Sequence, residues 1–363
     1  MSSRKLQKAL ALPHPHNKNL KLINMDLRGK DMITTQEWTR EELEAVLKFS
    51  KDLKKKTKAG KTSHLLSDKT FFMLFYNTST RTRASFEAAL TELGGHAQFL
   101  EPGAMRLGEG ESVKDTAYTL ARYGHGIGIR ILEKAVGYVY GRGNQVLREY
   151  AKWANIPIIN MADDKFHPCQ SLTDLMTVQE NFPKIQGKKF LFSWAYSRHS
   201  RSWCSVQSAI LTATRFGMDV TLAHPPGFEL DPEIMDWCNQ NANDSGGAFS
   251  ITNDIKEGYS GAHVVYPRSW MSTECSAMGI DKWGEDREAQ LHEQYQNWIC
   301  NSELMDLASK DAIYMHCLPV FRGEEATDEV VDSPQSVIFD QAENRLHLQK
   351  GLLSLVMSDE NLL

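Results

Sequence analysis

The sequence predicts an α/β fold with two doubly wound parallel-sheet domains. Apolar runs of strand length alternate with helical stretches, as expected when helices cover both faces of a parallel sheet. The alternation begins again in the second half, after a boundary between residues 166 and 186. A length of 363 residues is sufficient for two domains that each bury a core.

The first half contains four predicted strands. A helix begins near Thr35–Glu37, and Trp38 opens a helical stretch that ends in the lysine run 51–58. The predicted strands are short apolar runs at 71–76, 97–100, 126–132 and 157–161. Predicted helices separate them at 84–93, 113–123 and 144–154, and Gly94-Gly95 suits the end of the first.

The second half repeats this order and ends in a long helix. Its predicted helices are 172–181, 205–216, 232–245 and 341–357. Its predicted strands are 189–195, 219–223, 248–252, 263–266, 312–316 and 336–339. We therefore divide the chain into an N-terminal extension (1–31), a first domain (32–170), a second domain (171–340) and a C-terminal helix (341–363) that packs back on the first domain.

The composition argues against several classes of protein. With 41 Lys and Arg against 46 Asp and Glu, the net charge is −5, which gives no support for nucleic-acid binding. No apolar run approaches the roughly 18 residues of a membrane span, so no membrane partner is expected. The 6 cysteines lack the spacing of a zinc site or a disulfide framework, which predicts no bound metal and a cytoplasmic location.

The N-terminal extension leaves one alternative open. Its first 25 residues carry Arg4, Lys5, Lys8, Lys18 and Lys21 but no Asp or Glu. Such a composition is also typical of a transit peptide. Pro13 and Pro15 interrupt any amphipathic helix, and this favours an arm-like extension over a targeting segment.

The stretch 77–83 is a candidate anion site. It joins the strand 71–76 to a helix, whose first turn offers unpaired backbone N–H groups and a positive dipole end. Ser79, Thr80 and Thr82 add hydroxyl groups, and Arg81 can hold a phosphate through two parallel hydrogen bonds. The alternative is an ordinary helix cap beside two surface arginines. Neither a Walker loop nor a GxGxxG fingerprint occurs in the chain.

Two further motifs follow predicted strands. His167-Pro168-Cys169-Gln170 comes after 157–161, and His316-Cys317-Leu318-Pro319 ends the strand 312–316. Ligands of open α/β sheets bind at these carboxyl ends. Each motif alone is also compatible with a structural role. A nucleophilic Cys317 would need a base, and His316 is expected on the opposite face of its strand.

Together these three motifs closely resemble the aspartate/ornithine carbamoyltransferase family. The resemblance runs from about residue 32 to the C-terminus and includes Leu107–Ser112, Arg322–Glu325 and Glu343–Leu346. It implies a carbamoyl-phosphate domain followed by an amine-substrate domain. It also implies a homotrimer with active sites between subunits and a reaction without cofactor or metal.

The resemblance implies roles for residues that match the family motifs. The phosphate would be held by Ser79, Thr80, Arg81, Thr82 and Arg345. The carbamoyl group would be held by Arg130, His167, Gln170, Cys317 and the Leu318 carbonyl. Arg130, His167 and Thr82 would donate to the carbamoyl oxygen, with Cys317 orienting the amide. Arg106 lies in the loop 103–112, which resembles the loop donated by an adjacent subunit.

The expected acceptor pocket departs from that of ornithine enzymes. Those carry an Asp before a Ser-Met-Gly sequence to hold the α-amino group, whereas Pro267 or Arg268 stands at that place here. A cation attracts a carboxylate or acyl oxygen and repels an ammonium. We therefore expect Arg268, Trp270 and Cys317 to bind an ornithine-like amine that is N-acylated or anionic.

The connection 193–203 is longer than in ornithine enzymes and resembles the N-acetylornithine and N-succinylornithine carbamoyltransferases. Those enzymes have a knotted C-terminal domain, which we therefore expect here. Two positions depart from that pattern, because 103–112 contains no Trp and Glu325 stands where those enzymes have Lys. Ornithine or putrescine carbamoyltransferase, and a binding homologue without turnover, stay open as alternatives.

Overall fold

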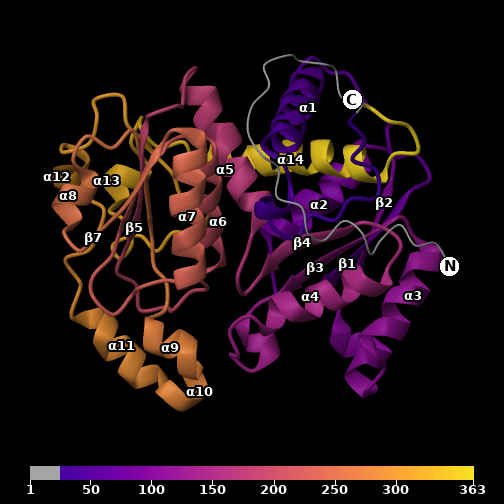
Figure 1. Cartoon of the computed structure of the whole chain (residues 1–363), viewed down its shortest axis with the longest axis horizontal. Coiled ribbons are helices and arrows are strands. Elements are labelled where there is room, and N and C mark those ends of the chain that lie inside the picture. The colour runs from indigo at the N-terminus through magenta and orange to yellow at the C-terminus, as the bar shows by residue number, and fades with distance from the viewer. Residues whose placement is uncertain (1–24) are drawn as a thin grey trace.

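The computed structural model describes residues 25–363, which form two α/β domains side by side (Figure 1). Residues 1–24 of the expected N-terminal extension lie outside the described residues. From Met32 onward the chain joins the first domain, where the Met32 N–H donates to the Ile158 carbonyl at 2.8 Å. None of the described helices is both long enough and apolar enough to cross a membrane.

The first domain is built on a four-stranded parallel sheet. Its strands are β1 (Thr70–Phe75), β2 (His96–Leu100), β3 (Gly126–Ile131) and β4 (Ile158–Asp163), in the order β2-β1-β3-β4. β1, β3 and β4 are buried throughout or nearly so, as their apolar sequences require. The helices are α1 (Arg40–Lys58), α2 (Arg81–Glu92), α3 (Val113–Tyr123) and α4 (Arg142–Trp153).

The second domain is built on a five-stranded parallel sheet. Its strands are β5 (Lys189–Trp194), β6 (Asp219–Ala223), β7 (Ala248–Thr252), β8 (Val264–Arg268) and β9 (Ile313–Tyr314), in the order β7-β6-β5-β8-β9. Figure 1 shows α6 (Cys204–Arg215) and α7 (Pro232–Ser245) on one side of this sheet, with α8 (Ile255–Tyr259), α12 (Ser302–Met305) and α13 (Asp328–Val331) on the other. Two parallel-sheet α/β domains confirm the predicted fold class, while the knot stays a prediction.

Two helices connect the domains. α5 (Pro168–Asn181) follows β4 and leads into the second domain, and α14 (Ile338–Met357, yellow in Figure 1) returns from the second domain to the first. α14 packs against α1, α2 and α5. A Cβ atom at Gly351 would lie 2.0 Å from Ser50 Oγ, so the close approach of α14 to α1 requires glycine at this position.

The structure corrects four predicted elements. The strand 336–339 is wrong: only Ser336 bridges to Tyr314, and Ile338 and Phe339 already belong to α14. A four-residue apolar run cannot by itself distinguish a strand from the first turn of a buried helix. The strand 312–316 shrinks to Ile313–Tyr314, so His316 lies in a loop.

The other two corrections concern helix starts. Trp38 does not open a helix, because 35–37 is a separate turn and α1 begins at Arg40 behind a Thr39–Glu42 capping box. α5 begins at Pro168, four positions before the predicted 172, since proline is well suited to the first turn of a helix. This earlier start places His167 at the N-terminus of α5.

Candidate active site between the two domains

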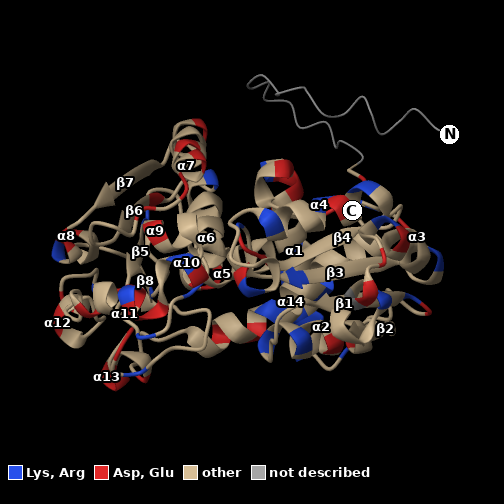
Figure 2. Ribbon diagram, turned by 90° about the horizontal axis from the view of Figure 1, so that it is seen from below, with Lys and Arg blue, Asp and Glu red and all other residues tan. Residues whose placement is uncertain are grey.

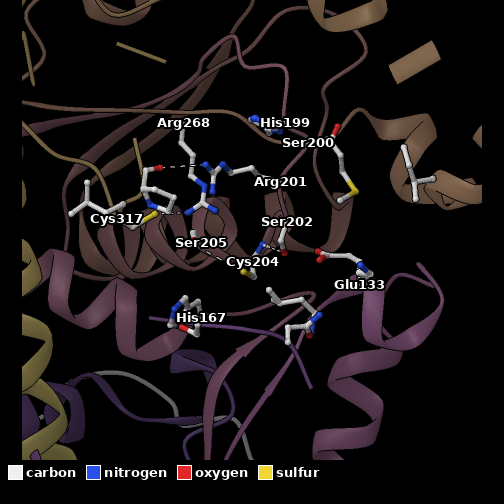
Figure 3. A pocket seen from close by; sticks show the side chains of 18 of the residues that line it. Glu133, His167, His199, Ser200, Arg201, Ser202, Cys204, Ser205, Arg268 and Cys317 are labelled. Carbon is white, nitrogen blue, oxygen red and sulfur yellow. Dashed lines mark hydrogen bonds between the residues drawn. The ribbon is translucent and has the colours of Figure 1, made fainter. Parts of the chain in front are cut away.

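A cavity of about 540 Å³ lies between the domains, at the carboxyl ends of β1, β3 and β8 (Figure 3). Most of the predicted site residues line it, although they come from distant parts of the chain. These are Ser79, Arg81, Thr82, Arg130, His167, Gln170, Arg268, Cys317, Leu318 and Arg345. Figure 2 shows basic residues gathered around α2 and α14, on the first-domain side of this region.

The start of α2 forms one wall. Thr82 is buried in its first turn, and Ser79 and Arg81 are half-buried beside it. No side chain caps this helix end, so its first N–H groups are available to a ligand that accepts hydrogen bonds. The Thr80 side chain is exposed and does not line the cavity.

Arg345, on α14, connects this helix to the start of α2 and to α5 through hydrogen bonds. Its guanidinium donates to Thr82 Oγ1 at 2.7 Å and to Gln170 Oε1 at 3.1 Å, while its buried Nε has no partner among the described residues. Gln170 in turn donates to Asp174 Oδ1 at 2.7 Å. Burial raises the pKa of Asp174 to about 7. The network holds Gln170 and Arg345 in one orientation before any ligand arrives.

Arg130 lies at an irregular point of the sheet. The register of β3 against β4 shifts between Ile129 and Arg130, opposite Ala162, whose φ is 146°. Such an irregularity re-aims the side chain of the strand. Burial lowers the pKa of Arg130 to about 10, so the guanidinium stays charged at neutral pH. Its Nε is buried and unpaired within residues 25–363.

His167 faces the same cavity as a neutral imidazole. Its backbone N–H donates to Ser208 Oγ at 2.7 Å, which fixes the residue against α6. Burial, followed by the charges of Arg345, Arg130 and Arg268, lowers its pKa well below the ordinary value. Nδ1 is buried without a partner in the described part of the chain, so it is free to bond a ligand.

Arg268 ends β8 and contacts Cys317. Its Nη1 donates to Cys317 Sγ, and both residues are buried in the second-domain wall. The thiol also lies beside Tyr266, whose pKa is raised well above its usual value by burial. Neither neighbour can act as a base at neutral pH. The geometry therefore favours an orienting role for Cys317 over a nucleophilic one.

His316 does not contact Cys317 as a base. The Leu318 N–H donates to its Nδ1 at 3.0 Å, and its Nε2 lies 3.3 Å from Glu325. Glu325 is fully buried and accepts from the Ser269 and Phe321 N–H groups, each at 2.9 Å. Glu325 thus braces the loops behind the wall and does not line the cavity.

Besides Thr80, two predicted site residues are not brought to the cavity. Trp270 is fully buried, donates from Nε1 to the Phe228 carbonyl at 2.9 Å, and packs on Phe192 in the hydrophobic core. Trp270 is two positions from Arg268 in the sequence, but β8 ends at Arg268 and the chain then turns, so the two side chains do not share the cavity. Arg106 is exposed and pairs with Glu109, away from the cavity of its own chain.

Sequence reasoning assigned no role to several residues of the wall. They lie in the connections after β3, β5 and β8, and include Glu133, Arg201, Ser202, Glu288 and His292. The Glu288 carboxylate accepts hydrogen bonds from the side chains of Ser272, Trp283 and His292. It joins α9 (Thr273–Met278), α10 (Ile280–Trp283) and α11 (Glu285–Glu293). These connections carry no periodic pattern, so no signal beyond the Arg-rich stretch 198–201 could have found them.

Models of one protein family match both domains. The model described as the aspartate/ornithine carbamoyltransferase carbamoyl-P binding domain matches residues 30–180, and that of the Asp/Orn binding domain matches residues 202–356. Ornithine carbamoyltransferase of Thermococcus kodakarensis is 39% identical over 92% of this chain and 98% of its own. N-acetylornithine carbamoyltransferase of Xanthomonas campestris pv. campestris is 38% identical over 90% and 98%.

Solved structures agree with this assignment. The ornithine carbamoyltransferase from Pyrococcus furiosus superposes with a TM-score of 0.81 at 38% identity, covering 92% of this chain and 98% of that one. An acetylornithine transcarbamylase complexed with acetylcitrulline gives 0.83 at 36% identity, covering 91% and 100%. The chain therefore belongs to the aspartate/ornithine carbamoyltransferase family.

Proposed function

We propose that this protein is a carbamoyltransferase. It moves the carbamoyl group of carbamoyl phosphate to the amino group of an ornithine-like acceptor and releases phosphate. The observation that carries the proposal is the meeting of Arg130, His167 and Arg345 with Arg268 and Cys317 across one cavity. The first three present buried, unpaired nitrogens to it, as a binding site for an anion and a polar carbonyl requires.

Carbamoyl phosphate occupies the first-domain half in this proposal. The start of α2, with Ser79, Arg81 and Thr82, holds the phosphate together with Arg345. Arg130 and His167 donate to the carbamoyl oxygen, and Gln170 and the Leu318 carbonyl hold the amide. Negative charge grows on the carbamoyl oxygen and the leaving phosphate as the amine attacks, so these donors stabilise the transition state more than the ground state.

The acceptor occupies the second-domain half. Arg268 offers the charge for a carboxylate or acyl oxygen, and it donates to Cys317 Sγ on the same wall of the cavity. Trp270 is left out of this proposal because its ring is enclosed in the core. An acceptor with an N-acyl or anionic group therefore suits this wall better than a bare diamine.

Glu325 favours a second candidate. It stands where the N-acetylornithine-type enzymes carry Lys, and its burial keeps it out of the cavity. Ornithine or putrescine is therefore the alternative acceptor. A screen of N-acetylornithine, N-succinylornithine, ornithine and putrescine with carbamoyl phosphate, followed by phosphate release and product mass, separates the candidates.

We expect the highest kcat/KM with an acylated or anionic ornithine. A higher kcat/KM with ornithine or putrescine would show that the acceptor is the second candidate and not an acylated ornithine. Carbamoyl-phosphate binding without turnover of any amine would instead favour a binding homologue.

The proposed assembly is a cytoplasmic homotrimer. Arg106 is exposed and does not line the cavity of its own chain, which suits donation to a neighbouring subunit. The six cysteines are buried and unpaired, as a reducing compartment favours. Light scattering should give three times the chain mass. Mixing an inactive Arg106→Ala variant with an inactive Arg130→Ala variant should restore part of the activity, because some sites then receive both native residues. A monomer with full activity would contradict the shared site.

A further inference from the structure

One carboxylate of the cavity wall has no role in the proposed reaction so far. Glu133 follows β3 in a short helical turn (Glu133–Val136), three positions after Arg130, and lines the cavity together with Arg130 and His167. Figure 3 shows its carboxylate directed toward Ser202 and Cys204, on the far side of the cavity from Arg268. Its side-chain bonding partner within residues 25–363 is Ser202, and Arg130 and Arg268 lie on the same cavity.

The other two carboxylates of the wall are unsuited to receive a substrate. Glu288 is buried and already accepts from the Ser272 hydroxyl at 2.6 Å, from Trp283 Nε1 at 2.9 Å and from His292 Nε2 at 3.1 Å. Glu285 lies exposed at the start of α11. Of the three carboxylates, Glu133 alone is half-buried, and it belongs to the first domain, as Arg130 and His167 do.

We propose that Glu133 is a catalytic residue: its carboxylate receives the acceptor as an ammonium ion and removes one proton before the nitrogen attacks. This inference rests on the proposed carbamoyl transfer and deepens it. An amine of the ornithine type is almost wholly protonated at neutral pH, since its ordinary pKa is about 10. A reaction that begins with a neutral nitrogen therefore needs a nearby acceptor for that proton.

The proton and electron balance closes without a further reactant. The ammonium gives one proton to the Glu133 carboxylate, which becomes a carboxylic acid, and leaves a neutral amine. The amine lone pair then forms the bond to the carbamoyl carbon, and the bond from that carbon to the phosphate oxygen breaks with its electron pair on the oxygen. A second proton passes from the nitrogen to the phosphate. Glu133 returns its proton to water when the products leave.

The surroundings of Glu133 suit a base near neutrality. The titratable and polar groups that face it come from five parts of the chain: Arg130, Tyr138, Asp164, Ser202 with Cys204, and Cys275. Burial raises the pKa of Glu133 to about 7, and the Ser202 hydroxyl and Arg130 offset part of the effect. A base with a pKa close to the working pH combines a large ionised fraction with useful basicity.

The experiment compares the pH dependence of kcat/KM for the best acceptor in wild type, Glu133→Gln and Glu133→Asp. Glu149→Gln, which changes an exposed glutamate on α4, is the matched control. The wild type should rise with pH to a plateau that begins near pH 7 and ends near the amine pKa of about 10. Glu133→Gln should be about 100-fold slower at pH 7 and should keep rising toward pH 10, because only the free amine then reacts.

The remaining variants and a binding measurement complete the test. Glu133→Asp should keep the rise of kcat/KM near pH 7 and have a lower kcat. Calorimetry should give every variant the wild-type Kd for carbamoyl phosphate. A Glu133→Gln enzyme with the wild-type pH profile would overturn the proposal, and so would loss of carbamoyl-phosphate binding in that variant, since the role would then be structural. A wild type that turns over no amine would instead overturn the proposed function itself.

Discussion

The two halves of the cavity are held by different kinds of structure. The first-domain half (Ser79, Arg81, Thr82, Arg130, His167, Gln170 and Arg345) is carried by strand ends and by the helices α2, α5 and α14. The second-domain half (Arg201, Arg268, Cys317 and the α9–α11 region) is carried mainly by long connections braced by Glu288 and Glu325. This difference agrees with the proposal that carbamoyl phosphate binds the half carried by rigid elements and the acceptor binds the half carried by loops.

The largest expected effect tests the first half. Arg130→Ala removes a buried donor that we propose for the carbamoyl oxygen, and it should lower kcat/KM by about 10²–10³ with every amine alike. Steady-state kinetics across the amine screen measures this. The exposed Arg142, whose guanidinium bonds Gln145 at 3.3 Å and does not line the cavity, supplies the control variant Arg142→Ala. A loss confined to one amine would show that Arg130 belongs to the acceptor half.

The second expected effect tests the bracing of the loops. Glu325→Gln replaces a carboxylate that accepts two buried N–H groups, and should lower the free energy of unfolding by about 2–3 kcal/mol. Denaturant unfolding at pH 7 measures this, with the exposed Glu329→Gln as control. An unchanged free energy of unfolding would show that the loops are held elsewhere.

The same glutamate predicts an acid dependence. Burial alone would raise its pKa, but His316, Arg201 and the Ser269 N–H lower it from the usual 4.5 to about 2. A carboxylate with a lowered folded-state pKa stabilises fully above its unfolded pKa and loses that contribution as the pH falls. The stability gap between wild type and Glu325→Gln should therefore be full above pH 4.5 and shrink toward pH 2. A gap that is constant over this range would contradict the assignment.

The smallest expected effect concerns Trp270. Trp270→Phe leaves the Phe228 carbonyl without its donor and should cost about 1–2 kcal/mol of stability. The acceptor KM should not change, because the ring lies in the core. A large rise in KM with unchanged stability would restore Trp270 to the acceptor site.

The contrast between a half built on strands and helices and a half built on connections explains which site residues could be predicted from the sequence. Ser79–Arg83 and His167–Gln170 are contiguous, and each follows a buried apolar strand, so their place at the edge of the sheet could be predicted. Arg345 was found only through the family resemblance, because its partner Thr82 lies 263 positions away. Glu133 and Arg201 sit on connections whose path depends on tertiary packing. Trp270 was wrongly predicted to line the cavity, because no sequence pattern indicates the turn after β8 that carries its ring into the core.

The central claim is that Arg268 selects the acceptor while the first half treats all acceptors alike. The most direct test is the ratio of kcat/KM for N-succinylornithine to that for putrescine, measured in wild type, Arg268→Ala and Arg122→Ala, a control at an exposed arginine of α3. Arg268→Ala should reduce this ratio by about 10²-fold, equivalent to about 2.7 kcal/mol of lost charge-assisted bonding, with the carbamoyl-phosphate Kd unchanged. An unchanged ratio in Arg268→Ala would contradict the account.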